Sequence, residues 1–255
     1  MLHIERQGSV VLWTVDRPEA KNALDHPTLD ALVSAIREAK ADPDVRAAVI
    51  TGAGDAFISG GDLRELRERN SAADAEELTD AGYALTSAIG ELPFPVVAAV
   101  AGPAIGGGAE LATACDLRVA DERARFCFKQ VRMGVTTAWG TVPRLVALVG
   151  AGAAARLLYT GQELGAAESK RLGLVEEVTD SGRAVTTAME WAADIARGSP
   201  KAVADTKRLL REATTTARDV RALERQLFIE TWSSADHRDA IEAYFERRLP
   251  RWNPR

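Results

Sequence analysis

The sequence has few of the residues on which disulfide frameworks and metal sites depend. Its 255 residues include two cysteines and three histidines, and neither a CxxC nor an HExxH pattern occurs. A disulfide framework needs more cysteines and an oxidising compartment. A zinc site needs ligands at recognisable spacings, and the histidines are scattered. We therefore expect no structural disulfide and no metal site.

Long apolar runs and an excess of positive charge are missing as well. No uninterrupted apolar run approaches the roughly 20 residues that a membrane span needs, and the first residues lack the basic-then-apolar order of a signal peptide. The formal net charge of −5 disfavours general binding to nucleic acid or to anionic membranes. We therefore expect a cytoplasmic protein that binds neither nucleic acid nor a membrane, while an anionic small molecule stays open.

A hydrophobic share of 46% is enough for one large domain, or for one domain with a helical appendage. In the first half, predicted strands alternate with predicted helices, which favours a parallel sheet with crossover connections. The strands are expected at residues 3–6, 10–15, 47–51, 95–100 and 117–120, and the helices at 27–40 and 76–92. The charged stretch at 64–77 is interpreted as a mobile loop or a frayed helix.

After about residue 140 the pattern becomes helical. Helices are expected at residues 145–160, 166–172, 183–197, 201–215, 220–233 and 236–248, interrupted by a strand at 174–178. This division predicts an α/β core over residues 1–195 and a C-terminal helical region over 196–255.

Two glycine-rich segments, residues 56–63 and 100–111, lie between a predicted strand and a predicted helix. Neither is a nucleotide-binding loop, because the Lys-Ser/Thr of a P-loop and a GxGxxG at a strand end are both absent. Amides at a helix N-terminus have no partner within the helix and can donate to an anion. Two such junctions facing each other would form an oxyanion hole. Alternatively, the glycines only permit close packing of helices on the sheet.

These segments resemble the enoyl-CoA hydratase/isomerase (crotonase) superfamily. The likeness rests on Phe57-x-Ser59-Gly60-x-Asp62-Leu63, on Gly102-x-x-x-Gly106-Gly-Gly-x-Glu110-Leu111 and on Cys115-Asp116. It extends to Arg17-Pro18-x-x-x-Asn22-Ala23-Leu24, to Gly161 with residues 166–175, and to Arg247-Arg248-x-Pro250, so that it covers essentially the whole chain.

The resemblance implies a crotonase-like (ClpP/crotonase) fold of repeated ββα units with a C-terminal helical region. It also implies an acyl-CoA substrate, assembly as a homotrimer or a hexamer (a dimer of trimers), and no cofactor apart from the coenzyme A of the substrate. The oxyanion-hole amides would belong to Ser59 and Gly107. The residues implied to hold coenzyme A or the acyl chain are Lys21, Asn22, Ala23, Gly60, Gly61, Asp62, Leu63 and Gly106, with Tyr244 and Arg247 from the C-terminal helix, possibly that of a neighbouring subunit.

Side-chain chemistry is expected at Glu110, three residues after Gly107. Its carboxylate could move a proton at Cα or Cβ of a bound acyl chain, or orient water. The alternative is an ordinary first-turn glutamate that neutralises the helix dipole. Hydratases of the superfamily have a second carboxylate twenty residues further on, and here that position is Gln130. An amide can hold a water but cannot exchange a proton near neutral pH.

Three functions therefore stay open. The first is a hydratase or isomerase that uses Glu110 and an enolate stabilised in an oxyanion hole. The second is a decarboxylase of a methylmalonyl- or ethylmalonyl-type CoA, in which Lys129 and Arg132 would attract the substrate carboxylate unless they are surface charges. The third is a non-catalytic acyl-CoA-binding protein. Trp139 would either shorten the acyl pocket or pack against the helical region.

Overall fold

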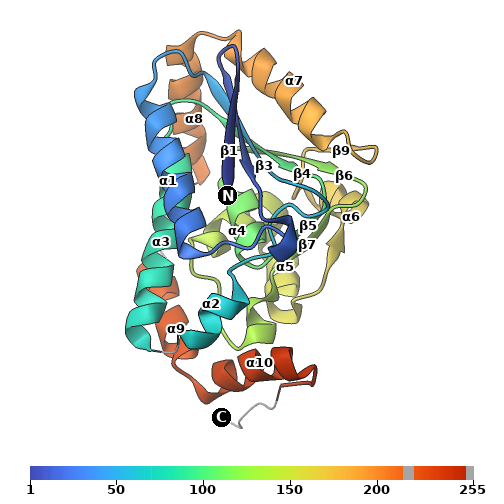
Figure 1. The fold of residues 1–255 in the computed structure, drawn as a ribbon. Coiled ribbons are helices and arrows are strands. Elements are labelled where there is room, and N and C mark those ends of the chain that lie inside the picture. Colours follow the sequence, from blue (N-terminus) through green and yellow to red (C-terminus); the bar gives the residue numbers. More distant parts are fainter. Residues whose placement is uncertain (70, 215–220, 251–255) are drawn as a thin grey trace.

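The computed structural model describes residues 1–69, 71–214 and 221–250. Its centre is a six-stranded sheet in the order β1-β2-β3-β4-β6-β9 (Figure 1). These strands are β1 (Leu2–Gln7), β2 (Val10–Val15), β3 (Ala47–Gly52), β4 (Val96–Val100), β6 (Leu117–Asp121) and β9 (Glu177–Thr179). Strand β1 is antiparallel to β2, and all other neighbouring pairs are parallel. The predicted α/β core with a parallel sheet is thus confirmed, with one antiparallel strand at its edge.

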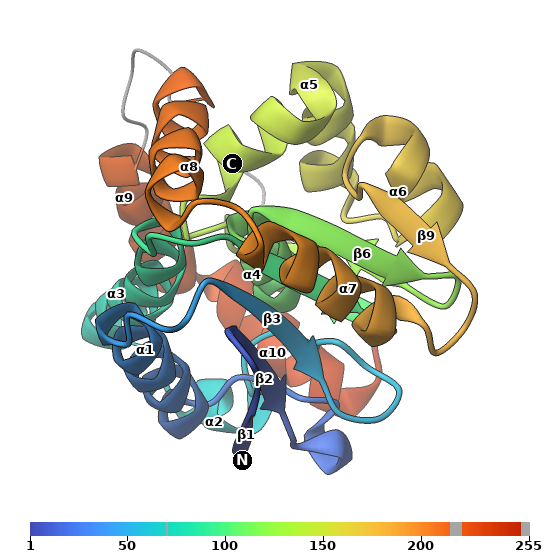
Figure 2. The same ribbon diagram turned by 90° about the horizontal axis from the view of Figure 1, so that it is seen from above.

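Helices cover both faces of this sheet, which explains why the central strands β3 and β4 are buried along their whole length. Ala48 and Ile50 of β3 face a cluster shared with α1 (His26–Ala41), α3 (Ala72–Gly90) and α4 (Gly107–Ala114). Ala47 and Val49 face the opposite cluster, which they share with α7 (Ala184–Ala196). Helix α7 lies across the sheet (Figure 2) and presents to it Ala184, Ala188, Ala192 and Ala196. The sheet is therefore buried between two helical layers.

A small second sheet follows the first and was not predicted. It joins β5 (Pro103–Ile105), β7 (Arg125–Cys127) and β8 (Leu164–Gly165). Strands of two or three residues are too short to produce an alternating pattern. Strand β5 leads directly into α4, and β7 leads into the 3-10 helix η2 (Lys129–Met133). The small sheet thus sets the relative positions of the helices that carry Glu110 and Gln130.

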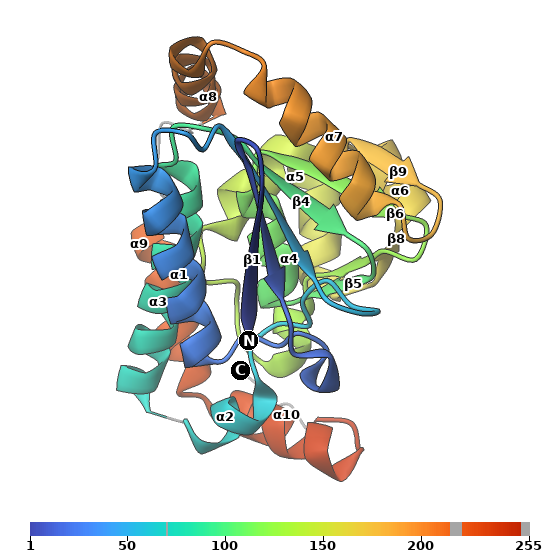
Figure 3. The same ribbon diagram turned by 45° about the horizontal axis from the view of Figure 1, so that its top comes forward.

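The second half of the chain is helical, as predicted. It contains α5 (Thr141–Thr160), α6 (Ala166–Leu172), α8 (Pro200–Thr214), α9 (Arg221–Trp232) and α10 (Ala235–Glu246). Helix α8 is fixed to the core by buried Lys207, whose Nζ donates to the carbonyls of Ile89 and Phe94 and to Asp116 Oδ2 at 2.8–3.0 Å. Helix α10 lies at the opposite end of the molecule, beside α2 (Leu63–Glu68) (Figure 3).

Helix α5 qualifies the expectation that no segment could span a membrane. By length and composition alone it is long and apolar enough to do so. However, Gly150 has non-helical dihedral angles (φ 76°, ψ 158°) and divides α5 into two shorter helices. Neither half approaches the roughly 20 residues that a helical span requires.

The charged stretch at residues 64–77 is helical on both sides of residue 70, which lies outside the described residues. Helix α3 begins at Ala72, four residues before the predicted start. A capping box explains this start, because Ser71 Oγ accepts from the amide of Asp74 while the Asp74 carboxylate accepts from the amide of Ser71. The interpretation of this stretch as a loop was therefore wrong.

Candidate active site

The two glycine-rich segments lie side by side at the carboxyl ends of β3 and β4. The amide of Phe57 donates to the carbonyl of Pro103 at 3.1 Å, and the amide of Ile105 donates to Ile58 at 2.9 Å. The close approach requires Gly108, because a Cβ there would lie 1.9 Å from the Ile58 carbonyl oxygen. Crevices at the carboxyl ends of parallel strands are where open α/β sheets bind ligands. The predicted convergence of the two segments is observed.

The amide of Ser59, which the resemblance assigns to the oxyanion hole, has an acceptor within the protein. Ser59 donates its backbone N–H to the carbonyl of Lys21 at 3.2 Å, and its hydroxyl donates to the carbonyl of Ala20 at 3.1 Å. Ser59 therefore fastens the turn at Ala20–Lys21, and its amide is not available to a ligand.

The amide of Gly61, two residues later, is a better candidate. It has no backbone acceptor within the described part of the chain, and the same is true of the Gly107 amide at the first position of α4. The segments face each other at this point, since a Cβ on Gly60 would lie 3.5 Å from the Gly107 nitrogen. Gly61 and Gly107 are both partly accessible. Gly61 and Gly107 thus provide the pair of donors that an oxyanion hole requires.

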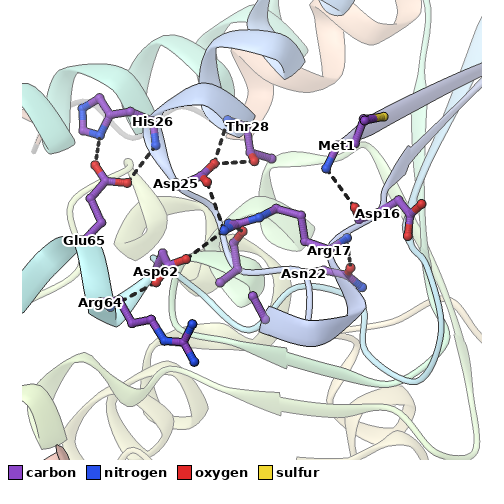
Figure 4. A network of polar contacts seen from close by, with 12 residues as sticks. Met1, Asp16, Arg17, Asn22, Asp25, His26, Thr28, Asp62, Arg64 and Glu65 are labelled. Atoms are coloured by element: carbon purple, nitrogen blue, oxygen red, sulfur yellow. Dashed lines mark hydrogen bonds and ion pairs between the residues drawn. The ribbon is translucent and has the colours of Figure 1, made fainter.

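An ion cluster built on Arg17 holds the predicted coenzyme A segments together (Figure 4). The Arg17 Nη2 atom lies 3.0 Å from Asp25 and 2.9 Å from Asp62, and its Nη1 donates to the Ala23 carbonyl. Asp25 caps α1 and Asp62 caps α2, so one guanidinium joins two helix starts. Burial raises the pKa of Asp25, but the hydrogen bonds from Thr28 and the charge of Arg17 outweigh it, and the pKa is lowered overall.

Asn22 is buried completely and serves this architecture. Its Nδ2 donates to the carbonyls of Ala53 and Ala56, both at 2.8 Å, and its Oδ1 accepts from the Arg17 amide at 2.9 Å. Its backbone is left-handed (φ 58°), a conformation that asparagine tolerates better than most residues. All the polar atoms of this side chain are used internally, so the predicted contact with coenzyme A cannot come from the side chain.

The carboxylate of Glu110 is buried on α4, one turn after the Gly107 amide. Its Oε1 accepts from the hydroxyl of Thr141 at 2.7 Å and from the amides of Ala138 and Trp139 at 3.1 and 3.4 Å. Its Oε2 accepts from Gln130 Nε2 at 2.8 Å. An exposed first-turn glutamate that only neutralises a helix dipole would not be enclosed in this way. The arrangement orients the carboxylate toward the neighbouring amides and Gln130.

Gln130 is also buried and has one polar atom without a use. Because a carboxylate only accepts hydrogen bonds, the amide nitrogen must be the atom that faces Glu110. The Gln130 Oε1 atom then has no hydrogen-bond partner among the described residues. A buried carbonyl without a donor is costly, and water or a ligand usually supplies one. The pair therefore presents one ionisable group and one acceptor.

The proposed cation site for a substrate carboxylate does not form beside this pair. Lys129 and Arg132 are both exposed, and Arg132 Nε donates to the carbonyl of Thr160 at 2.9 Å. The Arg132 side chain lies along Gly161, at the end of α5. Both residues therefore fit the alternative reading as surface charges.

The predicted residues of the C-terminal helix lie apart from the glycine segments. Tyr244 is 52% exposed, and its ring makes an edge contact with Phe245. Arg247 follows α10 in a left-handed conformation. This helix packs against η2, against α9 and against α2, the last through the Arg67–Glu242 ion pair. Within the described chain, neither Tyr244 nor Arg247 is brought to Glu110 or Gly61.

The two cysteines offer no competing nucleophile. Both are free and buried. Burial raises the pKa of the Cys115 thiol to about 12 and also raises the pKa of Cys127. Since the thiolate is the reactive form, these thiols are inert near neutral pH.

Comparisons with known proteins show which proteins this chain is similar to. The family model described as "Enoyl-CoA hydratase/isomerase" matches residues 5–255. The chain is 36% identical to the short-chain-enoyl-CoA hydratase of Clostridium acetobutylicum over 96% of this chain and 94% of that protein. It is 34% identical to the 2,3-dehydroadipyl-CoA hydratase of Escherichia coli, covering 98% and 97% of the two chains. The solved structure of an enoyl-CoA hydratase/isomerase from Xanthobacter autotrophicus matches with a TM-score of 0.89 and 30% identity, over 96% of this chain and 93% of that one.

Proposed function

This chain belongs to the enoyl-CoA hydratase/isomerase family, and we propose that it adds water to a 2-enoyl-CoA with Glu110 as the single acid–base group. The family acts on acyl-CoA thioesters. The observation that carries the choice of hydration is the buried Gln130 Oε1, which has no partner among the described residues beside the Glu110 carboxylate. Water supplies the hydrogen that this oxygen needs, whereas a double-bond isomerisation supplies none.

In the proposed reaction the thioester oxygen accepts from the amides of Gly61 and Gly107. A water molecule donates one hydrogen to Gln130 Oε1 and the other to Glu110 Oε2. The water oxygen attacks C3, its second proton passes to Glu110, and the π electrons move to the thioester oxygen, where the two amides stabilise the enolate. Glu110 then returns the proton to C2 and the carbonyl re-forms. Water is added, and the carboxylate is regenerated without a cofactor.

Isomerisation of a 3-enoyl-CoA is the second candidate, because it needs one base that removes a proton from C2 and returns it to C4. Glu110 can serve as that base, and its carboxylate is held in place by Gln130, Ala138, Trp139 and Thr141. This reaction would use the same oxyanion hole and leave Gln130 Oε1 without a role.

The test is a substrate screen of the purified wild type, with products identified by mass. Crotonyl-CoA, a 3-enoyl-CoA and methylmalonyl-CoA are compared, and Glu110→Gln serves as the control for contaminating host enzymes. Hydration of crotonyl-CoA by the wild type alone supports the proposal. Turnover of only the 3-enoyl substrate, decarboxylation of methylmalonyl-CoA alone, or binding of CoA esters without turnover would each overturn it.

The coenzyme A part of the substrate is proposed to lie along the turn at Lys21–Ala23 and the segment Gly60–Leu63. Hydrogen bonds between these segments support a shared binding surface: Leu24 donates its amide to Gly60, and Asp62 donates its amide to Leu24. We also propose a cytoplasmic location and assembly as a homotrimer or hexamer, with Tyr244 and Arg247 at a neighbouring subunit's ligand. Light scattering of the purified protein checks the assembly.

A further inference from the structure

Trp139 contacts both reacting elements of the site, Glu110 through its backbone and Gly107 through its ring. Trp139 is buried, and its amide donates to Glu110 Oε1 at 3.4 Å. The far end of its ring reaches Gly107, where a Cβ would lie 2.6 Å from Cη2. Glu110 and Gly107 are one turn apart on α4. Trp139 therefore contacts α4 at two places: its backbone amide at Glu110 and its indole at Gly107.

The opposite side of the ring is set against α3. A Cβ on buried Gly82 would lie 1.9 Å from both Cε2 and Nε1 of Trp139. No side chain at position 82 is compatible with the ring in this place. Gly82 and Gly107 together form a slot between α3 and α4 that the indole fills.

The backbone of Trp139 is held as firmly as its ring. Its carbonyl accepts from Thr86 Oγ1 of α3 at 3.1 Å and from the Arg144 guanidinium of α5. With the amide on Glu110 and the carbonyl on two donors, the residue is tied to α3, α4 and α5. These contacts fix the backbone from which the indole enters the slot.

We propose that Trp139 closes the acyl pocket and restricts this enzyme to short acyl groups of the crotonyl type. The inference rests on the proposed function, because it takes the thioester oxygen to lie at Gly61 and Gly107, and C2 and C3 to lie at Glu110. An acyl chain that continues past C4 then meets the indole. Densely packed interiors do not admit additional methylenes without displacing side chains.

The pocket limit is measured first without catalysis. The saturated esters butyryl-CoA and octanoyl-CoA are titrated into the wild type by calorimetry, since neither can be hydrated. Butyryl-CoA is expected to bind at least tenfold more tightly. Equal or tighter binding of octanoyl-CoA overturns the inference whether or not the protein is a hydratase.

The second measurement is the ratio of kcat/KM for crotonyl-CoA to that for 2-octenoyl-CoA. Trp139→Ala is expected to shift this ratio at least tenfold toward 2-octenoyl-CoA, and Trp139→Leu, which keeps more of the packing, to shift it in the same direction. The matched control is Trp191→Ala on α7, which removes an indole that packs against the other face of the sheet. An unchanged ratio in both Trp139 variants contradicts the inference, as does an equal shift in the control. Absence of hydration in the wild type contradicts the proposed function instead, and leaves the calorimetric result to decide on the pocket.

Discussion

Asn22 and Gln130 are both buried amide side chains, but they differ in how many of their polar atoms are hydrogen-bonded within the protein. Both polar atoms of the Asn22 side-chain amide are hydrogen-bonded to backbone groups, so this residue holds the turn next to the first glycine segment. Gln130 uses its nitrogen on Glu110 and has an oxygen without a partner in the described chain. Saturation of a buried polar group indicates a structural role, whereas an unused atom beside an ionisable group indicates a place for a ligand.

The same contrast separates the surroundings of the two residues. Around Asn22, the Arg17 cluster balances two capping aspartates with one guanidinium (Figure 4). Around Gln130, one buried carboxylate accepts from the Gln130 amide, and the amides of Gly61 and Gly107 on the adjoining segments have no backbone acceptor among the described residues. We therefore expect substitutions near Asn22 to lower stability and substitutions near Gln130 to lower turnover.

Glu110→Gln should have the largest effect on activity. It removes the only proton carrier that we propose, so kcat for crotonyl-CoA hydration should fall by about 10²–10⁴-fold, the usual contribution of general acid–base catalysis. The measurement is steady-state kinetics combined with thermal unfolding. A variant that keeps its turnover would refute Glu110 as the acid–base group. A loss of activity that merely follows a loss of folded protein would place Glu110 with Asn22 as a structural residue.

Asn22→Ala should have the next largest effect, and on stability. It leaves the buried carbonyls of Ala53 and Ala56 without donors, so the free energy of unfolding should fall by about 3 kcal/mol. Urea denaturation followed by circular dichroism measures the change. Asn22→Gly is the matched control, because glycine relieves the left-handed backbone but still lacks the amide. If the wild type and both variants are equally stable, Asn22 does not have the structural role that distinguishes it from Gln130.

The sequence was informative about which residue types stand at the site, and less so about which atoms are available. The resemblance to the superfamily pointed to Gly107 and, through the family's second carboxylate position, to Gln130. The sequence predicts Ser59 rather than Gly61 as an oxyanion-hole donor, because it does not reveal that the Ser59 amide already donates to the carbonyl of Lys21. The strands of the small second sheet were missed because they contain only two or three residues.

Substitution of His237, a third buried polar residue, should have a smaller effect than the two changes above. Its Nε2 is buried without a partner among the described residues, but the neighbouring groups are Met133 and Trp232 rather than a carboxylate. Burial lowers the pKa of this imidazole, with the charge of Arg238 acting in the same direction and the Met133 hydrogen bond opposing. Because the unpartnered Nε2 atom does not lie beside a carboxylate, substitution of His237 should affect stability alone.

The sign of the pH dependence follows from this lowered pKa. The unfolded chain binds a proton on His237 at a higher pH than the folded protein does, so the stability contribution is complete above the unfolded pKa of about 6.5. It is lost as the pH falls below that value, by at most about 1.4 kcal/mol per pH unit. Between pH 7 and pH 5, the thermal unfolding temperature should therefore decline less steeply for His237→Asn than for the wild type. Parallel declines would show that His237 does not titrate on unfolding.

The most direct test of the account is the hydration rate of Gln130→Met, which has nearly the shape of glutamine but lacks both the donor to Glu110 and the free acceptor. Initial rates with crotonyl-CoA are measured over a range of concentrations, next to a denaturation curve. For Gln130→Met we predict that kcat falls by about 10²-fold, that KM changes little, and that stability is kept. Unchanged kcat in a folded Gln130→Met variant would contradict the claim that the unused Gln130 oxygen holds the reacting water.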